Sequence, residues 1–191
     1  MARSIDDIYD ELLVLRCQDG ESDALNELVS RWHGRLLVHA FRLTGCREDA
    51  ADVLQDAWLA IVRGIRRLDD PARFRSWAYR IVTYKSADRV RRAARQRRVA
   101  RASAERVPVQ DSPEDPVDHA DEIGALRAAL RALPGDRRAI LTMHHLESMP
   151  LSEIAVALGI PEGTVKSRLH HARVHLKTTL EQAERKTHVR L

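Results

Sequence analysis

The chain has 191 residues, of which 44% are hydrophobic and 4% aromatic, and it carries a formal net charge of +4. This length and hydrophobic content allow one or two packed domains. The lack of any run of 18 apolar residues excludes a membrane-spanning helix, and the acidic start, MARSIDDIYDELL, has no apolar segment like that of a signal peptide. The two cysteines, Cys17 and Cys46, are too far apart for a metal knuckle, so we expect reduced thiols in a cytoplasmic protein without membrane insertion.

Apolar residues recur at helical spacing through the first hundred residues, where Gly and Pro are scarce. One such series is Leu25, Leu28, Val29 and Trp32, which would share one face of a helix. Ser22 is a candidate N-cap for that helix, and the sequence LDDPAR separates the third helix from the fourth. The pattern predicts helices at about 5–17, 22–44, 48–67 and 72–98.

Residues 107–121, VPVQDSPEDPVDHAD, contain three prolines and many acidic residues but almost no large apolar ones. This composition predicts an extended, solvated linker, after which helices resume at about 121–132 and 135–146. Basic residues exceed acidic ones on both sides of it, which suits a polyanionic partner. We therefore expect an all-α fold with a helical domain at 1–98, a flexible acidic linker at 99–120 and a second helical domain at 121–191.

The stretch LSEIAVALGIPEGTVKSRLHHARVHL, residues 151–176, is typical of a helix-turn-helix. Gly159 can adopt the left-handed conformation that ends a helix, and Val165, Leu169 and Ala172 give the second helix an apolar face. The opposite face is cationic, as in a helix that reads the major groove of duplex DNA. The candidate duplex contacts are Thr164, Lys166, Ser167, Arg168, His170, His171, Arg173 and Lys177.

Two other interpretations of this segment are open at this stage. An amphipathic helix with a solvated cationic face would show the same pattern. His171 and His175 have the i, i+4 spacing that can bind zinc, but no Cys or acidic ligand accompanies them, so we expect neither a metal site nor a cofactor.

The first domain contains an acidic stripe. The segment EDAADVLQDAWLAI places Asp49, Asp52, Gln55 and Asp56 on one polar face of a helix. Such a face repels DNA phosphates. It is either an ordinary solvated helix face or a binding site for another protein.

The helix that follows has the opposite charge. Between residues 73 and 98 there are many arginines and one acidic residue, Asp88. Trp77, Arg80 and Tyr84 share one side of this helix, and aromatic rings between cations suit single-stranded nucleic acid because bases stack on the rings. The alternative is that both aromatic rings pack in or beside the core.

Two segments, FRLTGCREDAADVLQDAWLAIVRGIRRL and FRSWAYRIVTYKSADRVRR, resemble the second region of sigma factors of the extracytoplasmic-function (ECF) group. The segment EIAVALGIPEGTVKSRL is similar to the fourth region of sigma factors and equally to the DNA-binding domain of LuxR-type regulators. The resemblance covers about residues 10–98 and 120–180. Two differences stand out: Tyr84 occupies a position that is often Asn in the family, and Pro150 stands where a capping Ser or Thr is common.

The resemblance implies a role for each surface. Binding to the clamp helices of core RNA polymerase would fall to Asp49, Asp52, Gln55 and Asp56. Contact with the melted −10 strand would fall to Phe74, Trp77, Arg80, Tyr84, Arg89, Arg91 and Arg92, with the loop at 70–75 as the wall of a pocket for a flipped base. The helix-turn-helix would read duplex DNA near −35, and the acidic linker would lie near the RNA exit path. An anti-sigma factor is the implied inhibitory partner.

These observations predict a promoter-specificity subunit of RNA polymerase and not an enzyme, since no nucleophile–base pair or metal set is evident. One alternative is a free-standing, LuxR-like helix-turn-helix regulator that binds duplex DNA as a dimer, with the first domain as a sensor. Another is a single-strand binding protein that uses only residues 73–98. Co-purification with core RNA polymerase separates the three.

Overall fold

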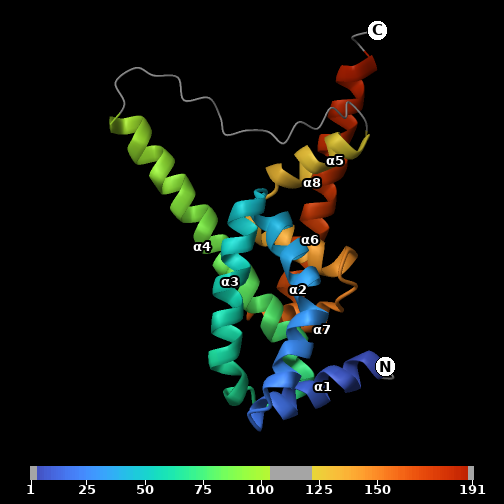
Figure 1. Cartoon of the computed structure of the whole chain (residues 1–191). Helices are drawn as coiled ribbons and strands as arrows, with labels where there is room; N and C mark the ends of the chain where they lie inside the picture. Colours follow the sequence, from blue (N-terminus) through green and yellow to red (C-terminus); the bar gives the residue numbers. More distant parts are fainter. Residues whose placement is uncertain (1–3, 104–121, 189–191) are drawn as a thin grey trace.

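The computed structural model of the chain describes residues 4–103 and 122–188 (Figure 1). These residues form helices joined by short turns, with no strand among them, so the predicted all-α fold is confirmed. The predicted linker at 99–120 lies largely outside the described residues, and its first part, up to Ser103, continues the preceding helix.

The N-terminal lobe consists of four helices, two of which are joined by a pair of 3-10 turns. The helices are α1 (Ile5–Gln18), α2 (Ser22–Thr44), α3 (Arg47–Gly64) and α4 (Phe74–Ser103). The turns η1 (Ile65–Arg67) and η2 (Pro71–Arg73) connect α3 to α4.

Local residue chemistry explains two of the helix ends in this lobe. Ser4 Oγ accepts a hydrogen bond from the Asp7 N–H, and the Asp7 carboxylate accepts one from the Ser4 N–H, forming a capping box at α1. Gly45 ends α2 in the left-handed conformation, with φ at 76°. The predicted N-cap at Ser22 is wrong, because Ser22 is the first helical residue and Glu21 precedes it without a side-chain cap.

The core of the N-terminal lobe is made of the apolar faces of all four helices. Its largest fully buried side chains include Leu13, Leu28, Leu36, Leu54, Ile61, Phe74 and Tyr79. The Trp32 ring lies edge-on to Phe74 and Tyr79, with centroid distances of 5.5 and 6.3 Å. Burial of one such side chain stabilises the fold by about 1.5–3 kcal/mol, so this packing fixes where α4 lies on α2 and α3.

The C-terminal lobe also has four helices, namely α5 (Glu122–Ala132), α6 (Gly135–His145), α7 (Leu151–Leu158) and α8 (Glu162–His188). Its core includes Ile140, Met143, Ile154, Val165 and Leu169. Gly159 is left-handed (φ 64°), as the sequence predicts, and turns the chain from α7 to α8. Pro150 provides no side-chain cap, yet α7 still begins at Leu151.

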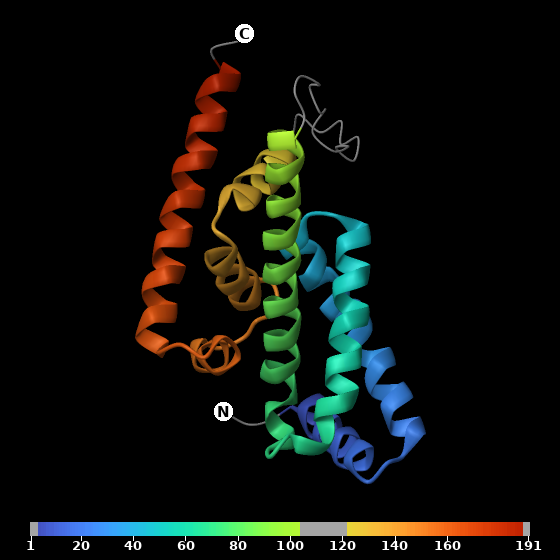
Figure 2. The ribbon, with the colours of Figure 1, turned by 90° about the vertical axis from the view of Figure 1, so that its left-hand side faces the viewer.

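The two lobes pack against each other. Figure 2 shows α4 in the centre, with α1–α3 on one side and α5–α8 on the other. Helix α4 contacts α7, and α2 contacts α6, so buried residues of both lobes form one continuous hydrophobic cluster. Across the described ranges, no helix has the length and apolar run that crossing a bilayer requires.

Candidate nucleic-acid and polymerase interfaces

Helix α8 presents a cationic face whose candidate contacts are open to solvent. Val165, Leu169 and Ala172 are buried against the rest of the lobe, which turns the neighbouring positions outward. The exposed residues on this face are Lys166, Ser167, His170, His171, Arg173 and Lys177. Thr164 is half-buried in the first turn of α8.

Two arginines of α8 have partners within the lobe. The Arg168 guanidinium forms an ion pair with Asp136 of α6 at 3.0 Å, which holds it away from the outer face. Arg173 donates its Nε–H to His145 Nε2 at 3.1 Å. Burial and the adjacent Arg173 lower the pKa of His145, so this ring stays neutral and keeps a lone pair for Arg173.

The side of α4 assigned to the −10 strand holds two rings in different environments. Tyr84 is 51% exposed, and the Arg80 guanidinium lies 5.6 Å from the centre of its ring. Trp77 is half-buried, and a Cβ added to Gly64 would lie 2.8 Å from its Cζ2 atom. The exposed part of the Tyr84 ring is therefore available for base stacking. Trp77, in contrast, also packs against Gly64 within the N-terminal lobe.

The structure changes the role expected for Phe74. Its side chain is 1% exposed and packs edge-on against Trp32, so a direct DNA contact is replaced by a core contact. The sequence FRSW gave no sign of this, because a ring at the start of a helix can point either way.

The acidic stripe of α3 lies beside the basic part of α4. Arg89 approaches Asp49 at 2.6 Å and Asp52 at 3.3 Å, and Lys85 lies 3.9 Å from Asp56. The Asp49 side chain is 23% exposed, while those of Asp52 and Asp56 are 62% and 68% exposed. Arg89, a predicted DNA contact, thus joins the two surfaces that the sequence kept separate.

The arginines beyond Arg89 extend into solvent. Arg91 and Arg92 both pair with Asp88, at 3.5 and 2.6 Å, and their side chains are 70% and 75% exposed. Surface pairs of this kind are weak and easily exchanged, so both guanidiniums can still reach a phosphate.

An apolar groove runs between α2 and α3, next to the acidic stripe. It encloses about 510 Å³ and is lined by Val29, His33, Leu37, Ala51, Leu54, Gln55, Trp58, Leu59, Val62 and Arg63. Leu59 and Val62 are 50% and 45% exposed, although both are apolar, and the buried Trp58 Nε1 has no hydrogen-bond partner. The helical pattern of the sequence did not predict this groove, although the segment WLAIV, which is apolar on every side of its helix, is the feature that indicates it.

A second cavity of about 310 Å³ lies at the loop that precedes α4. Ala72, Arg73 and Phe74 line it from the N-terminal lobe. Ser152, Glu153 and Val156 of α7 line it from the other lobe. The loop at 70–75, predicted to be the wall of a base pocket, therefore does face a cavity, and α7 closes one side of it.

Glu147, between α6 and α7, connects the lobes through polar contacts that the sequence did not reveal. Its side chain is 8% exposed. Its carboxylate accepts hydrogen bonds from Arg42 at 2.8 Å and from the Tyr79 hydroxyl at 2.5 Å, and its backbone oxygen accepts one from Arg75. Burial, and then this bond to Glu147, raise the pKa of Tyr79, so the phenol keeps the proton that it donates.

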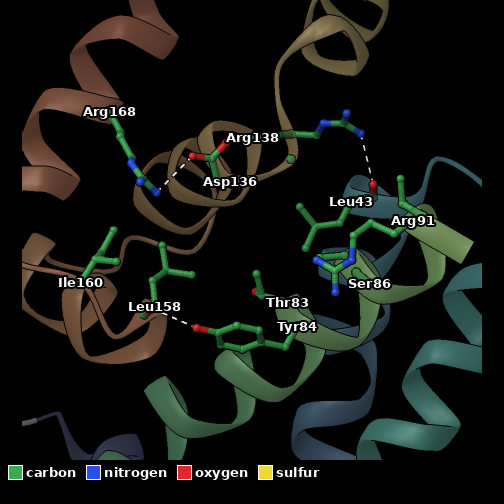
Figure 3. A pocket seen from close by; sticks show the side chains of 13 residues that line it. Leu43, Thr83, Tyr84, Ser86, Arg91, Asp136, Arg138, Leu158, Ile160 and Arg168 are labelled. Carbon is green, nitrogen blue, oxygen red and sulfur yellow. Dashed lines mark hydrogen bonds and ion pairs between the residues drawn. The ribbon is translucent and has the colours of Figure 1, made fainter. Parts of the chain in front are cut away.

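Figure 3 shows a further cavity between the lobes, of about 470 Å³. The Tyr84 hydroxyl donates to the Leu158 oxygen at 3.1 Å on one side of it. On another side, Arg138 donates to the Leu43 oxygen at 3.1 Å. The buried Ser86 Oγ on its wall has no partner, so the lobes meet through separate polar contacts around a gap.

Within the described part of the chain, no group of three or more His, Cys, Asp and Glu side chains could hold an ion. His144 and His145 contact each other through their rings, as do His170 and His171.

Two helical lobes, one ending in a helix-turn-helix, define a DNA-binding protein of the sigma-70 type. Family profiles support this class, since sigma-70 region 2 matches residues 28–96 and sigma-70 region 4 matches residues 123–176. Among solved structures, CnrH in complex with the cytosolic domain of CnrY is similar, with a TM-score of 0.66 and 28% identity. The match covers 91% of this chain and 98% of CnrH.

Curated relatives narrow the class. The ECF RNA polymerase sigma factor SigM of Mycobacterium tuberculosis is 35% identical over 164 residues, which cover 84% of this chain and 79% of SigM. The ECF sigma factor SigE of Mycolicibacterium smegmatis is 34% identical over 164 residues, and the chain spans 63% of its length. The chain belongs to the ECF group of RNA polymerase sigma factors.

Proposed function

We propose that this chain binds core RNA polymerase and directs it to particular promoters, by reading duplex DNA near −35 and holding melted DNA near −10. The observation that carries the proposal is the coexistence of two separate cationic surfaces, on α4 and α8, with an apolar groove on α3 that is bordered by acids. A free-standing regulator would use the α8 surface alone and would leave the groove and the α4 face without a purpose.

The polymerase-binding surface is assigned to the groove between α2 and α3 and to the acids at its edge. Leu59 and Val62 offer exposed apolar area for a partner helix, a common way of docking helices. Gln55 lines the groove itself, and Asp52 and Asp56 stand exposed beside it. Asp49 is committed to Arg89 and supports α4 instead.

The −10 surface is assigned to the exposed side of α4 and to the cavity at the 70–75 loop. Tyr84 offers a face for base stacking, with Arg80 beside it for a phosphate. Opening the duplex needs no hydrolysis here, because binding of the unpaired strand offsets the loss of base stacking, which is about a few kcal/mol per step. This role requires no catalytic group and fits a protein that acts in the cytoplasm.

The −35 surface is assigned to α8. Lys166 and Ser167 lie near its N-terminal end, the part of a recognition helix that contacts base edges. Arg173 and Lys177 lie further along it, where phosphates pass. In this assignment residues 1–98 bind polymerase and −10 DNA, and residues 121–191 bind −35 DNA. The part proposed for the acidic linker falls outside the described residues.

An inhibitory protein partner is also part of the proposal. CnrH, which is similar to this chain over nearly its whole length, was solved in complex with the cytosolic domain of CnrY. An anti-sigma factor bound over the groove between α2 and α3 would occupy the surface proposed for polymerase, so the two proteins would compete for this chain. Competition between a candidate partner and core polymerase, resolved by size, tests this part.

The deciding experiment is transcription with purified components. Core polymerase plus this chain is run on a genomic library, and transcripts are mapped to their starts. Transcripts that need the chain and share −10 and −35 sequences support the proposal. Binding of the chain to duplex DNA as a dimer, with no effect on polymerase, would instead identify a LuxR-like regulator.

A further inference from the structure

Two arginines of α8 are held by partners of different charge. The Arg168 guanidinium pairs with the Asp136 carboxylate at 3.0 Å, which offsets its positive charge locally. Arg173 instead donates its Nε–H to Nε2 of the exposed His145 at 3.1 Å. Among the side chains that the structure describes, no carboxylate forms an ion pair with Arg173, so its charge is still available to a DNA phosphate.

The partner of Arg173 is a neutral ring. Partial burial against the lobe, the charge of Arg173 and the neighbouring His144 lower the pKa of His145, so the imidazole carries no charge at neutral pH. Because its Nε2 accepts the Arg173 N–H, the ring proton lies on Nδ1. A neutral acceptor restrains a guanidinium without cancelling its charge, which a carboxylate in the same place would do.

His145 is itself held by a chain of contacts that begins in the core. Met149 is 1% exposed, and its N–H donates to the Met143 oxygen at 3.0 Å. The Met149 oxygen accepts a hydrogen bond from Nδ1 of His144 at 3.2 Å, because a carbonyl cannot donate. The rings of His144 and His145 meet edge to face, with their centroids 4.8 Å apart. These contacts connect the buried turn between α6 and α7 to Arg173 on α8.

Restraint of an arginine before binding increases its contribution to affinity. A free arginine side chain samples many rotamers, and immobilising such a side chain at an interface lowers affinity by a factor of about two to ten. A side chain that is already held near its binding position avoids part of this loss. The bond to His145 uses the Nε–H of Arg173 and leaves the N–H groups of both Nη atoms for a phosphate.

We propose that His145 is a positioning residue for DNA recognition, which holds the Arg173 guanidinium on the outer face of α8 for a phosphate of the duplex and does not contact DNA itself. The inference rests on the proposed function of α8. It adds to the −35 surface a residue that lies outside the recognition helix, at the end of α6. The recognition helix is therefore not sufficient by itself to define how its cations are presented.

The test compares the wild type with His145→Leu, which removes the acceptor, and with His145→Gln, whose side-chain oxygen can accept the Arg173 N–H. Arg173→Ala, alone and combined with His145→Leu, completes a double-mutant cycle. Each full-length protein is assembled with core RNA polymerase. The complex is titrated, at several salt concentrations, with the duplex that the wild-type complex selects from a random pool. The slope of log affinity against log salt concentration reports the number of phosphate contacts.

His145→Leu is expected to weaken binding by about fivefold with an unchanged salt slope, because Arg173 still reaches the phosphate from some of its rotamers. His145→Gln restores most of this affinity, since it returns an acceptor. Arg173→Ala weakens binding and reduces the salt slope by about 1. In the Arg173→Ala background, His145→Leu has no further effect, because the ring then has no guanidinium to position.

Four outcomes would overturn the inference. Wild-type affinity of His145→Leu, with a loss in Arg173→Ala, would show that Arg173 needs no positioning and would leave the −35 assignment intact. A reduced salt slope in His145→Leu, or a loss that persists in the Arg173→Ala background, would make His145 a DNA contact or a structural residue. Failure of His145→Gln to restore affinity would show that the acceptor atom is not what matters. Wild-type affinity of Arg173→Ala would remove Arg173 from the −35 surface, and wild-type affinity of Lys166→Ala as well would count against the assignment of α8 itself.

Discussion

Arg89 of α4 donates its Nε–H to Asp49 of α3 at 2.8 Å. This bond joins a residue predicted to bind DNA to a residue predicted to bind polymerase. The pair raises the pKa of Arg89 through the hydrogen bond and the charge of Asp49, so the guanidinium remains charged while it is held. Because Asp49 is committed to this contact, the acids on α3 are not equivalent.

Charge reversal of the two exposed acids, Asp52 and Asp56, should therefore change polymerase affinity more than the loss of the Asp49 charge. Asp52→Arg together with Asp56→Arg is expected to weaken binding to core polymerase, with helix content unchanged. Asp49→Asn should leave polymerase affinity within about twofold and release Arg89. Pull-down with core polymerase at moderate salt measures both, with Glu21→Arg as the control. Equal losses for Asp49→Asn and the double variant would contradict this division.

The groove on α3 gives a second test of polymerase binding. Leu59 is 50% exposed, so Leu59→Glu should keep the fold stable and cost about 2 kcal/mol in affinity if this residue is an anchor of the interface. Affinity is measured by titration of labelled chain with core polymerase. Val174→Glu is a matched control, because Val174 is 50% exposed on α8. Similar affinity for both variants would place the polymerase elsewhere.

The two rings of α4 should respond differently to truncation. Tyr84→Ala is expected to lose roughly 1–3 kcal/mol of affinity for a melted −10 template, as a stacked base loses its platform. Its effect on unfolding should be smaller than that of Trp77→Ala, because Tyr84 is half-exposed and gives up one hydrogen bond, to the Leu158 oxygen. Trp77→Ala should also lower the free energy of unfolding, because Trp77 packs beside Gly64. Fork-template binding and urea unfolding are the two measurements. An effect of Tyr84→Ala on −35 duplex binding would indicate misfolding instead.

On α8 the contrast is between Lys166 and Arg168. Lys166→Ala should relax base preference at one position of the −35 site, by about 1–3 kcal/mol. Arg168→Ala should chiefly remove the ion pair with Asp136 and leave base preference intact. Arg173→Ala should weaken all −35 sequences alike and reduce the salt dependence. Binding-site selection at two salt concentrations tests all three, and a preference unchanged by Lys166→Ala would make Lys166 a phosphate contact.

Acid should destabilise the fold through His39. Burial lowers the pKa of His39 to about 3 from an ordinary 6.5, so the folded protein keeps this ring neutral while the unfolded chain takes up a proton. The contribution of His39 is thus present above pH 6.5 and is lost as the pH falls toward 3, with a slope of up to about 1.4 kcal/mol per pH unit. His39 Nε2 lies 3.0 Å from Thr83 Oγ1. His39→Gln puts a polar side chain that does not titrate at this position and should flatten this part of the profile. The free energy of unfolding is measured by urea titration at a series of pH values, and the same pH dependence in the wild type and His39→Gln would refute the assignment.

The sequence alone determined the secondary structure and the faces of the helices. Helical periodicity, Gly159 and the break at LDDPAR depend on neighbours along the chain. Periodicity also placed Val165 inward and Lys166 outward correctly. The resemblance of two ordered segments then led to the sigma factor family. These features are local, so a pattern of residue types is sufficient to predict them.

Only the tertiary structure decided which polar and aromatic residues are free. Phe74 is in the core, Arg89 is held by Asp49, Arg168 is held by Asp136, and Glu147 is buried by residues far away in sequence. No pattern along the chain places Glu147 beside Tyr79, because their contact forms only when α4 packs against the segment between α6 and α7 of the other lobe. A sequence does not distinguish a charged side chain that faces water from one that faces DNA or a partner. The environment of that side chain is determined by the packing of helices that are distant in the sequence.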